Sequence, residues 1–125
     1  MTTATTFRQD YPYHGMPLTG ETTQSNGVVR ARTEHGWLDA AYPNPTGKHH
    51  RSDRLQHVER AYDPSAALVT TVTTTTQYDA YGNTTSIVVT PGDGSSKVTT
   101  NTYANDPASW RLGRLTRSAV QSSAP

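Results

Sequence analysis

The sequence predicts an all-β protein built as an antiparallel β-meander, and three observations carry that prediction. Threonine is the commonest residue, and it occurs in runs with valine and tyrosine, which are residue types that fit a pleated, half-buried surface. Turn signals such as Asn26-Gly27 and Gly82-Asn83 separate these runs. Leu, Ile, Val and Phe supply only 17 of the 125 residues, about 14% against the ~20% below which a packed core becomes doubtful. We therefore expect a threonine-rich sheet with a thin core.

Charge and residue counts exclude several classes of protein. The formal net charge is +1 and the densest basic stretch, residues 48–54, is short, so we expect no nucleic-acid partner, which would need a concentrated basic stripe. The chain has no cysteine, which excludes disulfides and a thiolate nucleophile. No apolar run approaches ~20 residues, so we expect no membrane insertion by this segment. The opening MTTATTFRQD has neither the basic nor the apolar region of a signal peptide.

Residues 1–34 are predicted to form a β-hairpin segment. Residues 10–15 contain proline and glycine, which mark a turn. Asn26-Gly27 is a strong hairpin signal, because both residues tolerate positive φ. In residues 28–32, small apolar side chains alternate with arginines, as in a strand with one solvated face.

Residues 35–65 have the weakest pattern and are predicted to be an irregular connection. Residues 42–47, YPNPTG, indicate a loop by their proline and glycine content. In residues 52–61, Leu55 and Val58 are three positions apart, which suits a helix, whereas Gln56, Val58 and Arg60 alternate as in a strand. Both alternatives stay open, and the β-rich surroundings favour the strand.

Residues 66–115 give the clearest pattern and are predicted to form the β-meander. Runs of β-prone residues at 67–78, 84–90 and 97–103 are separated by turn signals at 81–83 and 91–95. Short turns force consecutive strands to pair antiparallel. Residues 116–125 are rich in serine and alanine and end in proline, so we expect this tail to fray.

A Tyr-Asp pair recurs along the chain and opens the predicted turns. In such a unit, we expect the tyrosine ring to pack on the next strand with its hydroxyl in water. The aspartate is expected to accept hydrogen bonds from amides of the turn, and the glycine to supply the positive φ that closes it. The residues assigned to these units are Tyr62, Asp63, Tyr78, Asp79, Gly82, Asn83, Tyr103 and Gly113.

These units resemble the YD repeats of the Rhs (rearrangement hotspot) family, whose core element is Tyr-Asp-x-x-Gly-(Asn/Arg). Residues 78–83, YDAYGN, match this element, and residues 61–63 and 102–103 match it in part. Residues 7–18, FRQDYPYHGMPL, are similar to a segment of the B component of Tc insecticidal toxin complexes and of the plasmid virulence protein B group. In those proteins the segment follows a β-propeller and opens the repeat region. Thr84 departs from the repeat, in which leucine often follows Gly-Asn.

The resemblance implies a structural role. In these families the repeat region winds a long β-sheet into a hollow shell around a toxic C-terminal segment, and it performs no chemistry. By resemblance, the chain is a fragment of a YD-repeat β-shell, is not an enzyme and needs no cofactor. Its partners are then the remaining strands of the parent shell and the enclosed toxin segment. Its location is secreted or in the cell envelope, through the parent protein.

Metal and catalytic sites are weaker alternatives. His49, His50 and His57 with Asp53 are the right ligand types for zinc, but their spacing matches no compact motif. No Gly-x-Ser-x-Gly elbow is present, and no pair of carboxylates stands out for glycoside cleavage. We expect no metal and no catalytic residues.

Carbohydrate binding is the main alternative function, through aromatic rings that stack on sugars from an exposed sheet face. The opposing interpretation, which the composition favours, is that these aromatic side chains cover a thin core. The candidate stacking residues are Tyr11, Tyr13, Trp37, Tyr42 and Trp110.

Overall fold

The computed structural model describes residues 1–11, 13–41 and 50–125. In these residues, eight strands form one antiparallel sheet in which each strand pairs with its neighbours in sequence. The all-β meander predicted from the sequence is therefore confirmed. The described residues contain no helix long and apolar enough to cross a membrane. The elements are β1 (Thr2–Phe7), β2 (Pro17–Thr23), β3 (Val29–Ala41), β4 (His50–Tyr62), β5 (Leu68–Tyr78), β6 (Thr84–Pro91), β7 (Ser96–Asp106), the 3-10 helix η1 (Pro107–Ser109) and β8 (Arg111–Ser123).

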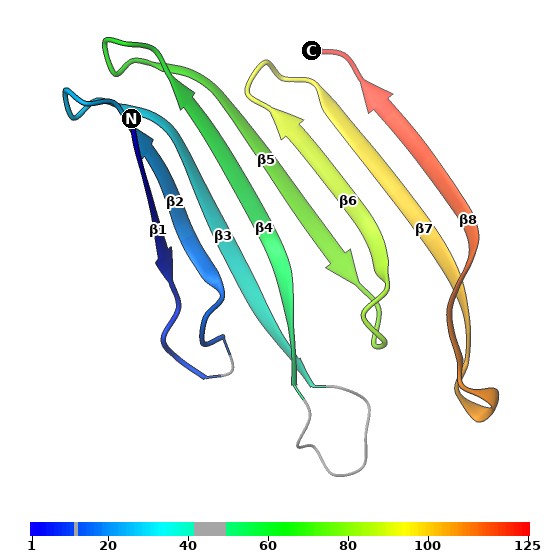
Figure 1. The fold of residues 1–125 in the computed structure, drawn as a ribbon. Coiled ribbons are helices and arrows are strands. Elements are labelled where there is room, and N and C mark those ends of the chain that lie inside the picture. Colours follow the sequence, from blue (N-terminus) through cyan, green and yellow to red (C-terminus); the bar gives the residue numbers. More distant parts are fainter. Residues whose placement is uncertain (12, 42–49) are drawn as a thin grey trace.

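The sheet is a single curved layer with two open edges (Figure 1). β1 and β8 lie at opposite ends of the strand order, and each is paired on one side only. Among the described side chains, the buried ones are Val58, at 8% exposure, and Asp53, at 7%. A compact monomer of 13.6 kDa exposes about 6,600 Å², whereas this chain exposes 8129 Å². The thin core expected from composition is thus a property of the fold.

Cross-strand pairs of threonine and β-branched residues stabilise the middle of the sheet. Thr74 lies opposite Val89 and Thr75 opposite Val88, so that each face of the sheet carries one of these pairs. Pairs of this kind contribute roughly 0.2–1 kcal/mol each. Side chains of β6 are almost all half-buried, because neighbouring strands cover them and no second layer does.

Three hairpins close with the same backbone hydrogen bonds. In the turns at 24–28, 63–67 and 79–83, the amide of the first residue donates to the carbonyl of the fifth, and the amide of the fourth donates back to the carbonyl of the first. The fourth residue has positive φ, 84° at Gly27, 69° at Ala66 and 86° at Gly82. Glycine adopts this conformation without strain and alanine does not. The predicted hairpin at Asn26-Gly27 and the predicted turn at 81–83 are both confirmed.

Residues 35–65 are not an irregular connection, and the structure corrects that expectation. They contain most of β3 and all of β4, which pair along their length from Ala31 opposite Ala61 to Ala41 opposite His50. The strand alternative for residues 52–61 is therefore confirmed. A register shift makes Leu55 an extra, unpaired residue in β4. Such a bulge interrupts the period-two alternation of a strand, and for this reason the sequence of residues 52–61 does not show a clear strand pattern. Residues 42–49 lie outside the described part.

Most of the tail does not fray. Residues 116–123 continue β8, which pairs along β7, with Val98 opposite Gln121 and Thr100 opposite Ala119. Serine and alanine do not favour strands by themselves. The partner strand β7 supplies the ladder hydrogen bonds that this composition does not indicate.

Candidate functional site

Three of the predicted repeat residues, Asp79, Gly82 and Asn83, form a hydrogen-bonded turn between β5 and β6. Asp79 follows the last residue of β5, and its Oδ1 accepts hydrogen bonds from the amides of Tyr81 and Asn83, both at 2.9 Å. This is the turn chemistry expected of the aspartate. Gly82 closes the same turn with its positive φ, as expected of the glycine.

The same carboxylate joins this turn to the end of β7 and, through it, to the start of β8. Asp79 Oδ2 accepts hydrogen bonds from Nδ2 of Asn83 at 2.9 Å and from Nδ2 of Asn105 at 3.0 Å. Asn105 Oδ1 accepts from the amide of Gly113 at 2.8 Å. Gly113 has a φ of 75°, and a Cβ there would lie 2.6 Å from Asn83 Oδ1, so glycine is required for both its conformation and its size. We call Asp79, Asn83, Asn105 and Gly113 the rim network.

The ionisation of Asp79 fits a role in binding amides. Partial burial alone would raise the pKa of Asp79, but the hydrogen bonds from Asn83, Asn105 and the amide of Tyr81 together hold it below its usual value. A carboxylate held ionised in this way is poorly matched to proton transfer near neutral pH. The rim network thus joins the β5–β6 turn to the adjoining ends of β7 and β8. Asn105 is the member that the sequence analysis did not identify.

Asp63 repeats the arrangement at the turn between β4 and β5, with fewer partners. Its Oδ1 accepts hydrogen bonds from the amides of Ser65 at 2.8 Å and Ala67 at 3.0 Å, and from Ser65 Oγ at 2.6 Å. The hydrogen bond from the Ser65 hydroxyl is the largest of the effects that lower the pKa of Asp63. Here Ala66 occupies the positive-φ position that glycine holds in the other two turns.

The tyrosines of the repeat units are half-buried. The Tyr78 hydroxyl, which we expected to remain in water, donates a hydrogen bond to the carbonyl of Arg54 on β4 at 2.8 Å. That carbonyl lies beside the bulge at Leu55, beyond the last paired residues of β4 and β5, Gln56 and Thr75. The structure places the repeat tyrosine as a brace between neighbouring strands.

The candidate sugar-stacking residues do not form one platform. Tyr11 and Tyr13 lie between β1 and β2, and Trp110 lies between β7 and β8, at opposite ends of the sheet (Figure 1). Trp37 is on β3, where its Nε1 donates to a carbonyl at the start of β2 at 2.8 Å. Trp110 is 80% exposed. Tyr42 lies outside the described residues.

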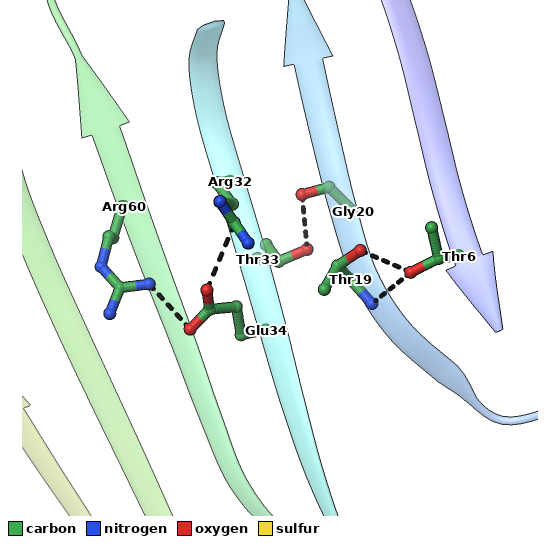
Figure 2. Close-up of polar contacts among 7 residues, drawn as sticks. All are labelled: Thr6, Thr19, Gly20, Arg32, Thr33, Glu34 and Arg60. Carbon is green, nitrogen blue, oxygen red and sulfur yellow. Dashed lines mark hydrogen bonds and ion pairs between the residues drawn. The ribbon is translucent and has the colours of Figure 1, made fainter. Parts of the chain in front are cut away.

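A charged cluster that the sequence analysis missed joins β3 to β4 (Figure 2). Glu34 accepts from Arg60 at 2.8 Å and from Arg32 at 3.2 Å. The hydrogen bond from Arg60, followed by the charges of both arginines, outweighs partial burial and lowers the pKa of Glu34. Arg32 and Glu34 are two residues apart, and Arg60 comes from the neighbouring strand, so the cluster becomes visible only when the register is known.

A histidine pair lies on the opposite face of the same two strands. His35 and His57 are directly opposed in the ladder, with their Nδ1 atoms 3.1 Å apart. Nε2 of His57 lies 2.9 Å from Oε1 of Glu59, and the Trp37 ring stacks on His35 with 6.3 Å between centroids. The pKa of His35 is lowered, first by burial and then by the nearby charges of His57 and Arg54.

The histidines considered as zinc ligands do not come together in the described part of the chain. His57 contacts His35 and Glu59, while His49 and the side chain of His50 lie outside the described part. In the portion that the structure describes, no group of three or more His, Asp or Glu side chains could hold a metal ion.

Comparison with known proteins identifies no relative, so a function must be argued from the fold and from the contacts described above. No protein-family model matches the chain, and no curated protein and no solved structure is significantly similar to it.

Proposed function

We propose that the chain is a wall segment of a YD-repeat β-shell of the Rhs and Tc toxin B type, with a structural role and no chemistry of its own. The observation that carries the proposal is the single-layer meander in which the two consecutive turns after β4 and β5 are each closed by a Tyr-Asp pair, Tyr62-Asp63 and Tyr78-Asp79. A wall one sheet thick grows by adding hairpins at its edge, and it does not need a core of its own. Among the described residues, the buried side chains are those of Val58 and Asp53. So little burial fits a wall one sheet thick.

The rim network supports the proposal, because it links one hairpin to the next. Asp79 closes the β5–β6 turn and also bonds Asn105 of the following hairpin. In repeat proteins, each unit is stabilised by contacts with its neighbours. A Tyr-Asp unit that fixes its own turn and the end of a nearby strand has the properties of a repeating wall element.

On this proposal, the partners are the remaining strands of the parent shell and a toxin segment enclosed by it. The parent protein is then secreted or attached to the cell envelope. The open ladders of β1 and β8 are the positions at which neighbouring strands would pair.

Edge pairing provides the test. We expect the purified chain to associate in a concentration-dependent manner in size exclusion with light scattering. A double variant with Thr3→Lys and Thr5→Lys on β1 should shift the chain toward monomer, because charged residues block edge pairing. The matched control places Thr70→Lys and Thr90→Lys on the interior strands β5 and β6, at two other exposed positions, and should associate as the unmodified chain does. A strictly monomeric chain at all concentrations would contradict the proposal.

The second candidate is carbohydrate binding, and the exposure of Trp110 favours it. This indole is 80% exposed and is held at a positive φ of 56° after η1. We expect Trp110→Ala to abolish binding in a screen of the chain against immobilised glycans if this function operates. Binding unaffected by Trp110→Ala, or no binding at all, would exclude carbohydrate binding through Trp110 and leave the wall segment as the one proposed function.

A further inference from the structure

The His35–His57 pair combines two titratable rings in direct contact, on strands that have no second layer over them. The rings lie 4.6 Å apart between centroids, and the His57 side chain is only 18% exposed. A hydrogen bond between two imidazole nitrogens requires a proton on one nitrogen and a lone pair on the other. The 3.1 Å contact therefore depends on the protonation state of both rings.

Glu59 decides which ring donates. The contact between His57 Nε2 and the Glu59 carboxylate requires a proton on Nε2. In the neutral ring, Nδ1 of His57 is then the acceptor, and Nδ1 of His35 is the donor. One additional proton can enter at Nε2 of His35 without breaking this bond. A second additional proton must enter at Nδ1 of His57, and it replaces the hydrogen bond with two opposed imidazolium rings.

Few groups can offset that repulsion. The described charged groups that act on His35 are Arg54 and Glu59, both from β4. β5 presents Thr74 opposite His57, and β2 presents Gly20 on this face beside Thr33. The carboxylate of Glu59 is 58% exposed, so solvent screens much of its attraction, while Arg54 adds to the repulsion.

We propose that the His35–His57 pair is an acid-sensitive seam between β3 and β4, which holds the strands together at neutral pH and loosens them in mild acid. The pair lies next to the bulge at Leu55, where the ladder is already interrupted. Loosening is therefore expected at residues 33–37 and 54–59, with the rest of the sheet intact. The seam works in the same way whether or not the sheet belongs to a shell.

The direction of the pH effect follows from proton counts. His35 has a lowered pKa in the folded chain, so the folded state binds fewer protons than the unfolded state in mild acid. The stabilisation is complete above the unfolded histidine pKa of about 6.5 and is lost as the pH falls below it.

Hydrogen-exchange protection factors of the full chain at pH 7.5 and 5.0 test the seam. We expect a several-fold loss of protection at pH 5.0, confined to residues 33–37 and 54–59. His35→Gln removes the titrating donor while keeping a neutral polar side chain, and it should abolish the pH dependence. His14→Gln, which changes a histidine in the β1–β2 loop, is the control and should behave as the unmodified chain does.

Nitrogen-15 NMR titration of the unmodified chain decides the matter even if His35→Gln does not fold. We expect His57 to carry its proton on Nε2 at pH 7.5, and the pKa of His35 to lie below its ordinary value. Titration of His35 at its ordinary value would overturn the seam. Equal loss of protection in the unmodified chain and in His35→Gln would overturn it as well.

Discussion

The rim network and the β3–β4 seam hold the same kind of antiparallel ladder together by different means. In the rim network, one carboxylate binds amides from its own turn and from Asn105 on β7, and its partners do not titrate. Across β3 and β4, the side-chain contacts are made by ionisable pairs, Glu34 with Arg60 and His35 with His57. We therefore expect the contacts of the rim network to be insensitive to mild acid, because the pKa of Asp79 is lowered. We expect the β3–β4 contacts to depend on pH and salt, because they join ionisable groups.

The largest expected effect is the loss of the Asp79 carboxylate. Asp79→Ala removes four hydrogen bonds to a charged acceptor, and we expect the free energy of unfolding to fall by about 2–3 kcal/mol. Urea denaturation of both proteins measures this difference. The matched control is Asp93→Ala, which removes hydrogen bonds from the amide and the hydroxyl of Ser95 and should have a smaller effect.

Equal effects of Asp79→Ala and Asp93→Ala would contradict the importance of the link between hairpins. In that case Asp79 would act only within its own turn, as Asp93 does.

Acid should weaken the rim network in a lower pH range than the seam. Hydrogen bonds from Asn83 and Asn105 outweigh the effect of burial and lower the pKa of Asp79, and those from Ser65 and Ser95 lower the pKa values of Asp63 and Asp93. The stabilisation from these groups is therefore present above their unfolded pKa of about 3.9 and is lost as the pH falls below it. Protection at residues 79–83 should be constant from pH 7.5 to 5.0. A parallel decline of the seam and the rim network over that range would remove the distinction between them.

The turn at Ala66 offers a stabilising substitution. Ala66 has a φ of 69° where Gly27 and Gly82 occupy the same position in their turns. Ala66→Gly should raise the free energy of unfolding by about 1 kcal/mol, because the left-handed conformation costs about 1–2 kcal/mol for a residue with a Cβ. Gly82→Ala is the reciprocal variant and should lower it by a similar amount. Thermal unfolding followed by circular dichroism compares the three proteins, and a destabilised Ala66→Gly would show that the turns are not equivalent.

The smallest effect is expected in the charged cluster of β3 and β4. Glu34 is 37% exposed, and its partner Arg60 is 30% exposed, so water screens much of their attraction. Glu34→Gln should lower the free energy of unfolding by no more than about 1 kcal/mol. The difference from the unmodified chain should shrink further at 1 M salt, where screening acts within about 3 Å. A salt-independent difference would mean that Glu34 acts through packing.

Sequence reasoning predicted the elements whose signals are local and missed those that depend on register. The strands from Leu68 to Tyr103 alternate with strong turn signals, and the aspartate turn follows from the chemistry of Asp79 and Gly82. The β3–β4 pairing was missed because the bulge at Leu55 breaks the alternation. The contact of His35 with His57 joins residues 22 positions apart. Only the pairing register of β3 and β4 determines it, and no short motif encodes that register.

The most direct test of a one-layer sheet with open edges is residue-resolved hydrogen exchange of the full chain at pH 7.5, at a concentration low enough that the chain is monomeric. Amides in β4 to β7, paired on both sides, should be protected. In β1 and β8, amides that face away from the single partner strand should exchange rapidly and alternate with protected ones. Uniform protection along β1 and β8 would contradict the account, because it would mean that another layer or strand covers both edges.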